Sequence, residues 1–73
     1  MKNKPEILKT IALNVRKERL SKNLSQEELA DLAQVHRTYI GMIERAEKNI
    51  TVGNLQKISI ALNVNIKSLF DAS

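Results

Sequence analysis

The sequence predicts a compact all-α domain of five helices over residues 1–73. Apolar residues recur at three- and four-residue spacing, which is the period of helices that bury one face. Residues that favour helix ends, mainly Ser, Thr and Asn, stand between these apolar segments. No alternating pattern typical of a strand competes with them. A chain of 73 residues allows one domain with a small core.

The first helix is expected from about Pro5 to Lys22. Pro5 suits the first helical turn, where its missing N–H would be unpaired anyway. Asn23 follows the helix, where a left-handed conformation is common and Asn tolerates it. The apolar face of this helix is expected to contain Ile7, Leu8, Ile11, Ala12, Val15 and Leu20.

The second helix is expected to end near Ala33, and the third helix is expected to span about Arg37 to Arg45. Ser25 and Glu28 form a capping-box pattern, in which the serine side chain and the glutamate satisfy each other's backbone N–H groups. His36 stands at the N-cap of the third helix, where Ser, Thr or Asp is more usual.

A polar connector, Ala46 to Ile50, leads to the expected fourth helix. Thr51 is its expected N-cap, and Asn63 marks its end. Asn65 then caps a short fifth helix, residues 66–70. The inner face of the fourth helix is expected to contain Leu55, Ile58, Ala61 and Leu62.

Residues 26–45 contain two short helical patterns separated by a tight turn, with Val35 as the apolar residue of the corner. This is the helix-turn-helix layout, in which the first helix crosses the DNA backbone and the second enters the major groove. The pattern predicts that the protein reads a double-stranded DNA sequence. Apolar or inward positions are Leu29, Ala30, Ala33, Ile40, Ile43 and Glu44, and outward positions on the second helix are Arg37, Thr38, Gly41 and Met42.

Composition agrees with a nucleic-acid partner and argues against several other classes. Twelve Lys and Arg against eight Asp and Glu give a net charge of +4, which favours a polyanion, although many small domains carry such a charge. The sequence has one His and no Cys. We therefore expect no enzyme, thiolate metal site or cofactor. With Tyr39 and Phe70 as the only aromatic residues, a stacking platform for single strands is not expected.

Targeting signals are also not expected. No apolar run approaches the roughly 18 residues of a membrane helix, and the apolar residues after Lys2 and Lys4 are interrupted too early for a signal peptide. We expect a protein of the bacterial cytoplasm, associated with the nucleoid.

Three segments carry a family resemblance: residues 24–30 (LSQEELA), 39–45 (YIGMIER) and 55–64 (LQKISIALNV). Together they resemble the Cro/C1-type (Xre-like) helix-turn-helix family, whose domains have a lambda-repressor-like fold. Residues 36–45 and 49–51 are similar, more narrowly, to restriction–modification controller proteins. Phage-type repressors and antitoxins of toxin–antitoxin pairs share much of this pattern and remain alternatives.

The resemblance implies a homodimer that binds pseudo-palindromic operator repeats upstream of its own gene and regulates both that gene and an endonuclease gene. RNA polymerase is a further partner that it allows, and it implies no small-molecule ligand and no membrane. It also implies base contacts by Arg37, Thr38 and Met42. An arginine can bond O6 and N7 of guanine, and a threonine methyl suits the thymine methyl. Met42 has the alternative of being simply exposed.

The resemblance also implies contacts with the DNA backbone, among them one by Gln26, which stands at a helix N-terminus where unpaired N–H groups favour phosphate. The ring of Tyr39 has core packing as an alternative that does not exclude DNA contact, and Thr51 is already explained as an N-cap. A phosphate beside His36 would favour its protonated form, so DNA affinity is expected to rise modestly below about pH 6.5. The expected backbone contacts are Gln26, His36, Tyr39, Arg45, Lys48, Asn49 and Thr51.

Arg19 and Glu44 match a family pair that forms a partly buried salt bridge, so we expect both to stabilise the fold. Gln34 and Ala46 stand where glycine is common in the family, and a left-handed backbone would strain Gln34. Gly41 implies close approach of DNA or of another helix. Residues 60–73 are the expected dimerisation segment, with Ile66, Leu69 and Phe70 at the interface unless they close the monomer core.

Overall fold

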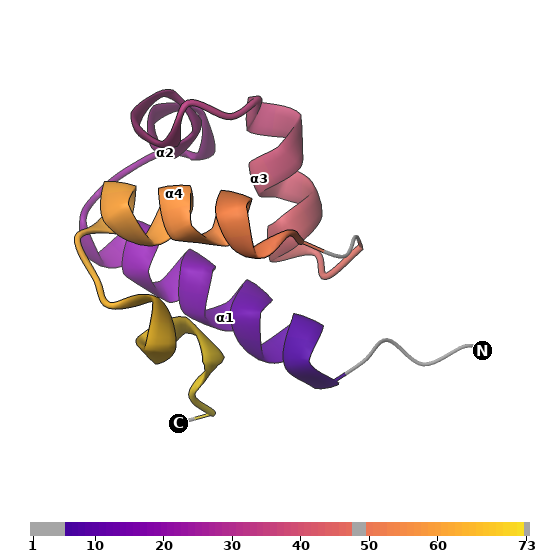
Figure 1. Ribbon diagram of the computed structural model, residues 1–73. Helices are drawn as coiled ribbons and strands as arrows, with labels where there is room; N and C mark the ends of the chain where they lie inside the picture. The colour runs from indigo at the N-terminus through magenta and orange to yellow at the C-terminus, as the bar shows by residue number, and fades with distance from the viewer. Residues whose placement is uncertain (1–5, 48–49, 73) are drawn as a thin grey trace.

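The computed structural model describes residues 6–47 and 50–72, and these residues are all-helical with no strand. In Figure 1, α2 and α3 lie on one side of α4, while the C-terminal segment lies on the other side against α1. The all-α class is confirmed. The elements are α1 (Glu6–Ser21), α2 (Gln26–Ala33), α3 (Arg37–Glu44), α4 (Val52–Leu62) and the 3-10 helix η1 (Ile66–Phe70).

Local capping chemistry sets the ends of these helices. Asn23 and Asn63 follow α1 and α4 with φ of 57° and 58°, the left-handed conformation that the sequence predicts. The Thr51 hydroxyl accepts from the Asn54 N–H at 3.1 Å and caps α4, as predicted. The expected role of Pro5 in the first turn lies outside the described residues.

The expected fifth α-helix is instead a 3-10 helix, so the prediction of five α-helices is wrong by one element. The Asn65 side chain caps it, accepting from the Lys67 N–H at 2.9 Å. The Ser68 N–H then bonds to the Asn65 carbonyl three residues back, at 2.9 Å. Five residues are too few to build a regular α-helical ladder, and short segments commonly tighten into this form.

The core lies where α1, α2, α3, α4 and η1 meet. Seven of its side chains are almost fully buried, and each contributes on the order of 1.5–3 kcal/mol through the hydrophobic effect. Leu20, expected on the inner face of α1, is 52% exposed. The preceding residue, Arg19, faces inward, and the next position is rotated by about 100° around the helix. The seven residues are Val15, Leu29, Ile40, Leu55, Ile58, Leu62 and Leu69.

Candidate nucleic-acid interface

The start of α2 is fixed by the predicted capping box. The Glu28 N–H donates to the Ser25 hydroxyl at 2.9 Å, and the Ser25 N–H donates to the Glu28 carboxylate at 2.8 Å. At the other end, Gln34 takes the left-handed conformation with φ of 59°. The Val35 N–H then bonds to the Ala30 carbonyl at 3.0 Å. These local contacts turn the chain sharply from α2 into α3.

His36 caps α3 with its imidazole ring. Its Nδ1 accepts from the Thr38 N–H at 3.0 Å, so this nitrogen carries no proton. The ring therefore replaces the Ser, Thr or Asp side chain that is usual at this position. The N-cap position of His36 is as predicted from the sequence, and the structure adds that the ring itself forms the capping hydrogen bond.

The residues of α3 lie on two faces, one exposed to solvent and one packed in the core. Arg37 and Thr38 are exposed, whereas Ile40 and Ile43 are buried. Tyr39 is partly buried against the core, and its hydroxyl accepts from the Asn54 amide at 3.3 Å. The exposed side chains are thus held on a helix whose opposite face is anchored in the core.

Two residues expected to point outward on α3 do not do so fully. Met42 is half-buried and Gly41 is buried. A Cβ on Gly41 would lie 3.1 Å from Arg45 Nη1 and 3.6 Å from Gln26 Oε1. Side chains from α2 and from the end of α3, rather than the backbone of another helix, therefore occupy the space beside this glycine.

A buried ion pair joins α1 to the end of α3. Arg19 Nε donates to Glu44 Oε2 at 2.7 Å and Nη2 donates to Oε1 at 3.0 Å, as expected of this pair. The Glu44 side chain is only 2% exposed. The hydrogen bond with Glu44 raises the pKa of Arg19; burial opposes that rise, and the charge of Glu44 adds to it.

The same carboxylate also orients Gln26. Gln26 Nε2 donates to Glu44 Oε1 at 3.1 Å, which holds the first side chain of α2 against the end of α3. The structure thus brings together one expected DNA contact and the expected salt bridge. No buried side-chain nitrogen or oxygen among the described residues lacks a hydrogen-bond partner.

Arg45 forms an exposed ion pair that sequence reasoning missed. Its Nε donates to Glu47 Oε2 at 2.7 Å, and its Nη2 donates to Oε1 at 3.3 Å. This hydrogen bond and the charge of Glu47 raise the pKa of Arg45. Ala46 lies between them with φ of 55°, which brings positions 45 and 47 onto one side of the chain. The expected contacts Lys48 and Asn49 lie outside the described residues.

The expected dimer residues have three different environments. Leu69 is fully buried, so its expected place in an interface is wrong: it closes the monomer core. Ile66 is partly buried against that core. Phe70 is 41% exposed. Asn14, also missed from the sequence, holds this segment on α1 by donating to the Leu69 and Asp71 carbonyls at 2.9 and 2.8 Å.

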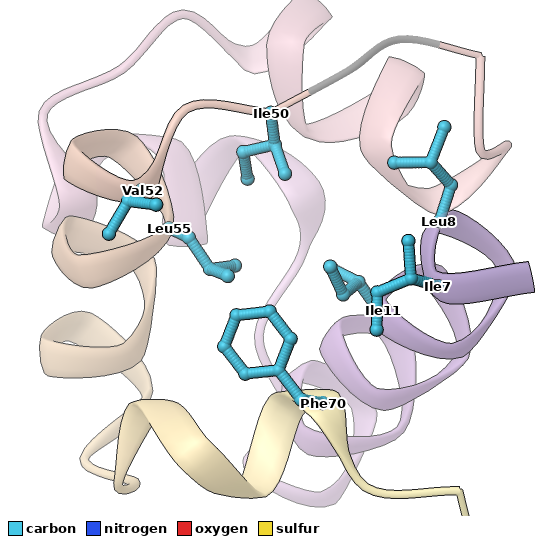
Figure 2. A pocket seen from close by; sticks show the side chains of 7 residues that line it. All are labelled: Ile7, Leu8, Ile11, Ile50, Val52, Leu55 and Phe70. Atoms are coloured by element: carbon cyan, nitrogen blue, oxygen red, sulfur yellow. The ribbon is translucent and has the colours of Figure 1, made fainter. Parts of the chain in front are cut away.

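Phe70 borders an apolar groove of about 240 Å³ between α1, the start of α4 and η1. In Figure 2 its ring lies between side chains of α1 and side chains of the α4 region. None of the described residues that line the groove belongs to α2 or α3. It is lined by Ile7, Leu8, Ile11, Ile50, Val52, Leu55 and Phe70.

Two other features are absent from the part of the chain that the structure describes. The described residues contain no group of three or more His, Cys, Asp or Glu residues that could hold a metal ion. Within residues 6–47 and 50–72, no helix combines the length and the apolar character needed to cross a bilayer.

A family model described as Helix-turn-helix matches residues 15–69, from the second half of α1 to η1. This chain belongs to the helix-turn-helix family. More specifically, it is an Xre-like member, and the expected relation to restriction–modification controller proteins is confirmed by the similarities below.

Two curated relatives of this helix-turn-helix chain are control proteins. Control protein C.SmaI of Serratia marcescens is 45% identical over 64 residues, which cover 88% of this chain and 76% of the relative. Control protein C.BamHI of Bacillus amyloliquefaciens is 53% identical over 58 residues, which cover 78% and 72%.

Solved structures share the same helical arrangement. The restriction–modification controller protein C.AhdI from Aeromonas hydrophila has a TM-score of 0.84 at 36% identity, covering 86% of this chain and 96% of that one. SinR, a master regulator for biofilm formation solved in complex with DNA, has a TM-score of 0.80 at 34% identity, covering 84% and 98%.

Proposed function

We propose that this protein is a sequence-specific double-stranded DNA-binding transcriptional regulator. The observation that carries the proposal is the exposure of Arg37 and Thr38 at the start of α3, while Ile40 and Ile43 anchor the same helix in the core. In the helix-turn-helix geometry, the N-terminal residues of the second helix contact base edges in the major groove. The net charge of +4 supports a polyanionic partner.

In this proposal, Arg37 and Thr38 read base edges by the hydrogen-bond fork and the methyl contact available to them. Half-buried Met42 adds an apolar contact to a base. The Glu44 carboxylate already orients Gln26, which meets a phosphate at the N-terminus of α2. The other proposed backbone contacts are His36, Tyr39, Arg45, Lys48, Asn49 and Thr51.

We propose that the protein binds operator repeats as a homodimer, because one recognition helix reads only a few base pairs. Two helices of such a dimer lie about 34 Å apart, one turn of DNA. Phe70 and the apolar groove form the proposed interface, with Ile66 at its edge. Exposed apolar side chains at its rim support this assignment, since Val52 and Ile7 are 70% and 45% exposed.

Similarity to the two control proteins supports the role of a restriction–modification controller. The proposed operator lies upstream of the protein's own gene and of the endonuclease gene, and RNA polymerase is a further proposed partner. Such a protein acts in the bacterial cytoplasm, at the nucleoid. Neither a catalytic step nor a cofactor is part of this function.

Footprinting on the DNA upstream of its own gene, combined with binding titrations at several salt concentrations, tests the proposal. We expect a pair of protected half-sites. We also expect log K to fall linearly with the logarithm of the salt concentration, with a slope of about −0.9 for each phosphate neutralised. A salt-independent affinity would contradict it. Arg37→Ala should relax specificity at one base position by about 1–3 kcal/mol, whereas Gln26→Ala should weaken binding to all sequences similarly.

A further inference from the structure

Arg37, Gly41 and Arg45 follow one another at four-residue spacing, so they lie along one face of α3 and its C-terminal cap. Gly41 is buried because side chains cover it. The Cβ position of Gly41 lies 3.1 Å from Arg45 Nη1 and 3.6 Å from Gln26 Oε1. The Arg45 guanidinium therefore lies back along the recognition helix, beside the start of α2. The absence of a side chain at position 41 makes this placement possible.

Glu47 holds the guanidinium in this position. Two nitrogens of Arg45 face its two carboxylate oxygens, at 2.7 and 3.3 Å. The side chains are 57% and 46% exposed, so water and ions reach both. Ion pairs this exposed are weak and exchange readily. The planar fork of arginine fits a phosphate in the same two-pronged way as a carboxylate.

We infer that Glu47 restrains Arg45 and lowers the affinity of the protein for DNA, because a backbone phosphate must replace the Glu47 carboxylate as the partner of the guanidinium. This inference rests on the proposed function, in which the surface of Gln26, Arg37 and Arg45 faces DNA. The restraint acts on all DNA sequences alike and sets the protein concentration at which the operator becomes occupied.

The exchange also changes the dependence of binding on salt. In the wild-type protein, Arg45 leaves the Glu47 carboxylate when it binds a phosphate. The number of phosphate charges neutralised is therefore offset by the ion pair that is lost, and it is smaller than the number of phosphate contacts. Removing the charge of Glu47 should therefore steepen the slope of log K against log salt, by up to about 0.9.

Glu47→Gln tests the inference, with Asp71→Asn as the matched control. Both remove one negative charge from an exposed residue, but Asp71 follows η1 at the C-terminal end of the chain and belongs to neither α2 nor α3. Dissociation constants are measured on operator DNA and on an unrelated duplex of equal length. We expect Glu47→Gln to bind both duplexes about threefold to fivefold more tightly, and Asp71→Asn to change affinity less than about twofold.

The same two substitutions in an Arg45→Gln background show whether Glu47 acts through Arg45. There, Glu47→Gln should tighten binding no more than Asp71→Asn does. Equal tightening by Glu47→Gln in both backgrounds would overturn the inference, because it would reveal only a general charge effect. The inference would also be overturned if, in the wild-type background, Glu47→Gln bound DNA no more tightly than Asp71→Asn. If wild-type protein shows no salt-dependent binding to either duplex, the proposed function fails instead.

Discussion

Gln34 has a left-handed backbone conformation, which glycine would adopt without strain. Its φ of 59° costs roughly 1–2 kcal/mol for an L-residue, and glycine removes that cost while adding freedom to the unfolded chain. We expect Gln34→Gly to raise the free energy of unfolding by about 0.5–1 kcal/mol. Urea denaturation followed by circular dichroism measures the change.

Asn63→Gly is the matched control for this substitution. Asn63 has nearly the same φ, 58°, but its short polar side chain tolerates the left-handed conformation. We therefore expect a smaller gain in stability, or none. Equal gains at both positions would show that the identity of the side chain at position 34 causes no strain.

His36 has a structural role, as the cap of α3, that is distinct from its expected contact with DNA. Its Nδ1 caps α3 through the Thr38 N–H. His36→Ala should lower the free energy of unfolding by about 1 kcal/mol, whereas His36→Asn keeps an acceptor and should be nearly neutral. Thermal or urea unfolding of the two variants measures the difference. Equal destabilisation by Ala and Asn would contradict the capping role.

The expected pH effect on DNA binding needs the same Asn variant. An imidazolium has no acceptor nitrogen, so the charge that attracts a phosphate also removes the cap. His36→Asn keeps an acceptor for the cap and cannot take up this charge, so it separates the two effects. Binding titrations at neutral and acidic pH compare the two proteins, and identical pH profiles would contradict a role for His36 on DNA.

At the level of helices, one buried ion pair connects α1, α2 and α3. Glu44 accepts from Arg19 and from Gln26, so it fixes both the position of α3 and the first side chain of α2. The helix-turn-helix angle depends on this contact as well as on the apolar core. Because the pKa of Arg19 is raised, its contribution to stability is present below its ordinary pKa and does not weaken as pH rises through the neutral range.

Glu44→Gln should lower the free energy of unfolding by about 3–5 kcal/mol, since it leaves the buried Arg19 guanidinium without a counter-charge. Lys22→Met is the control, because it breaks the exposed Glu18–Lys22 pair. That pair should contribute about 0.3–0.5 kcal/mol. Chemical denaturation measures the free energy of unfolding of both variants. Similar small decreases would show that the buried Arg19–Glu44 pair stabilises the fold no more than the exposed pair does.

For the molecule as a whole, the proposed DNA surface and the proposed dimer surface are built from different elements. Arg37 and Thr38 lie on α3, whereas the apolar groove is lined by residues of α1, the α4 region and η1 (Figure 2). One chain can therefore contact DNA and a second copy at the same time.

Phe70→Asp should convert the proposed dimer into monomers, because the interface would bury a carboxylate without a partner against the apolar groove. Phe70 is 41% exposed in the single chain, so the fold should survive the substitution. Leu13→Asp, at a position 69% exposed on α1 and outside the groove lining, should leave the dimer intact. Analytical ultracentrifugation measures both, and a dimeric Phe70→Asp variant would refute this interface.

The sequence was sufficient to predict the helices and most of their ends. Ser25, Asn23, Thr51 and Asn63 act on backbone groups within a few residues, so their roles follow from local sequence alone. The 3-10 form of residues 66–70 was not predicted, since a five-residue apolar segment fits either helix type. The Arg19–Glu44 pair was expected only through family resemblance, because its members are 25 positions apart.

Contacts between distant residues could not be predicted in the same way. Periodicity identifies an apolar face but not the element that covers it, so Leu69 was assigned to an interface although it completes the core. Gly41 carries no side chain from which to infer its neighbours, and the structure places Arg45 and Gln26 there. Local sequence determines helices because their hydrogen bonds span three or four residues, whereas packing determines the surfaces because it depends on residues brought together by the whole fold.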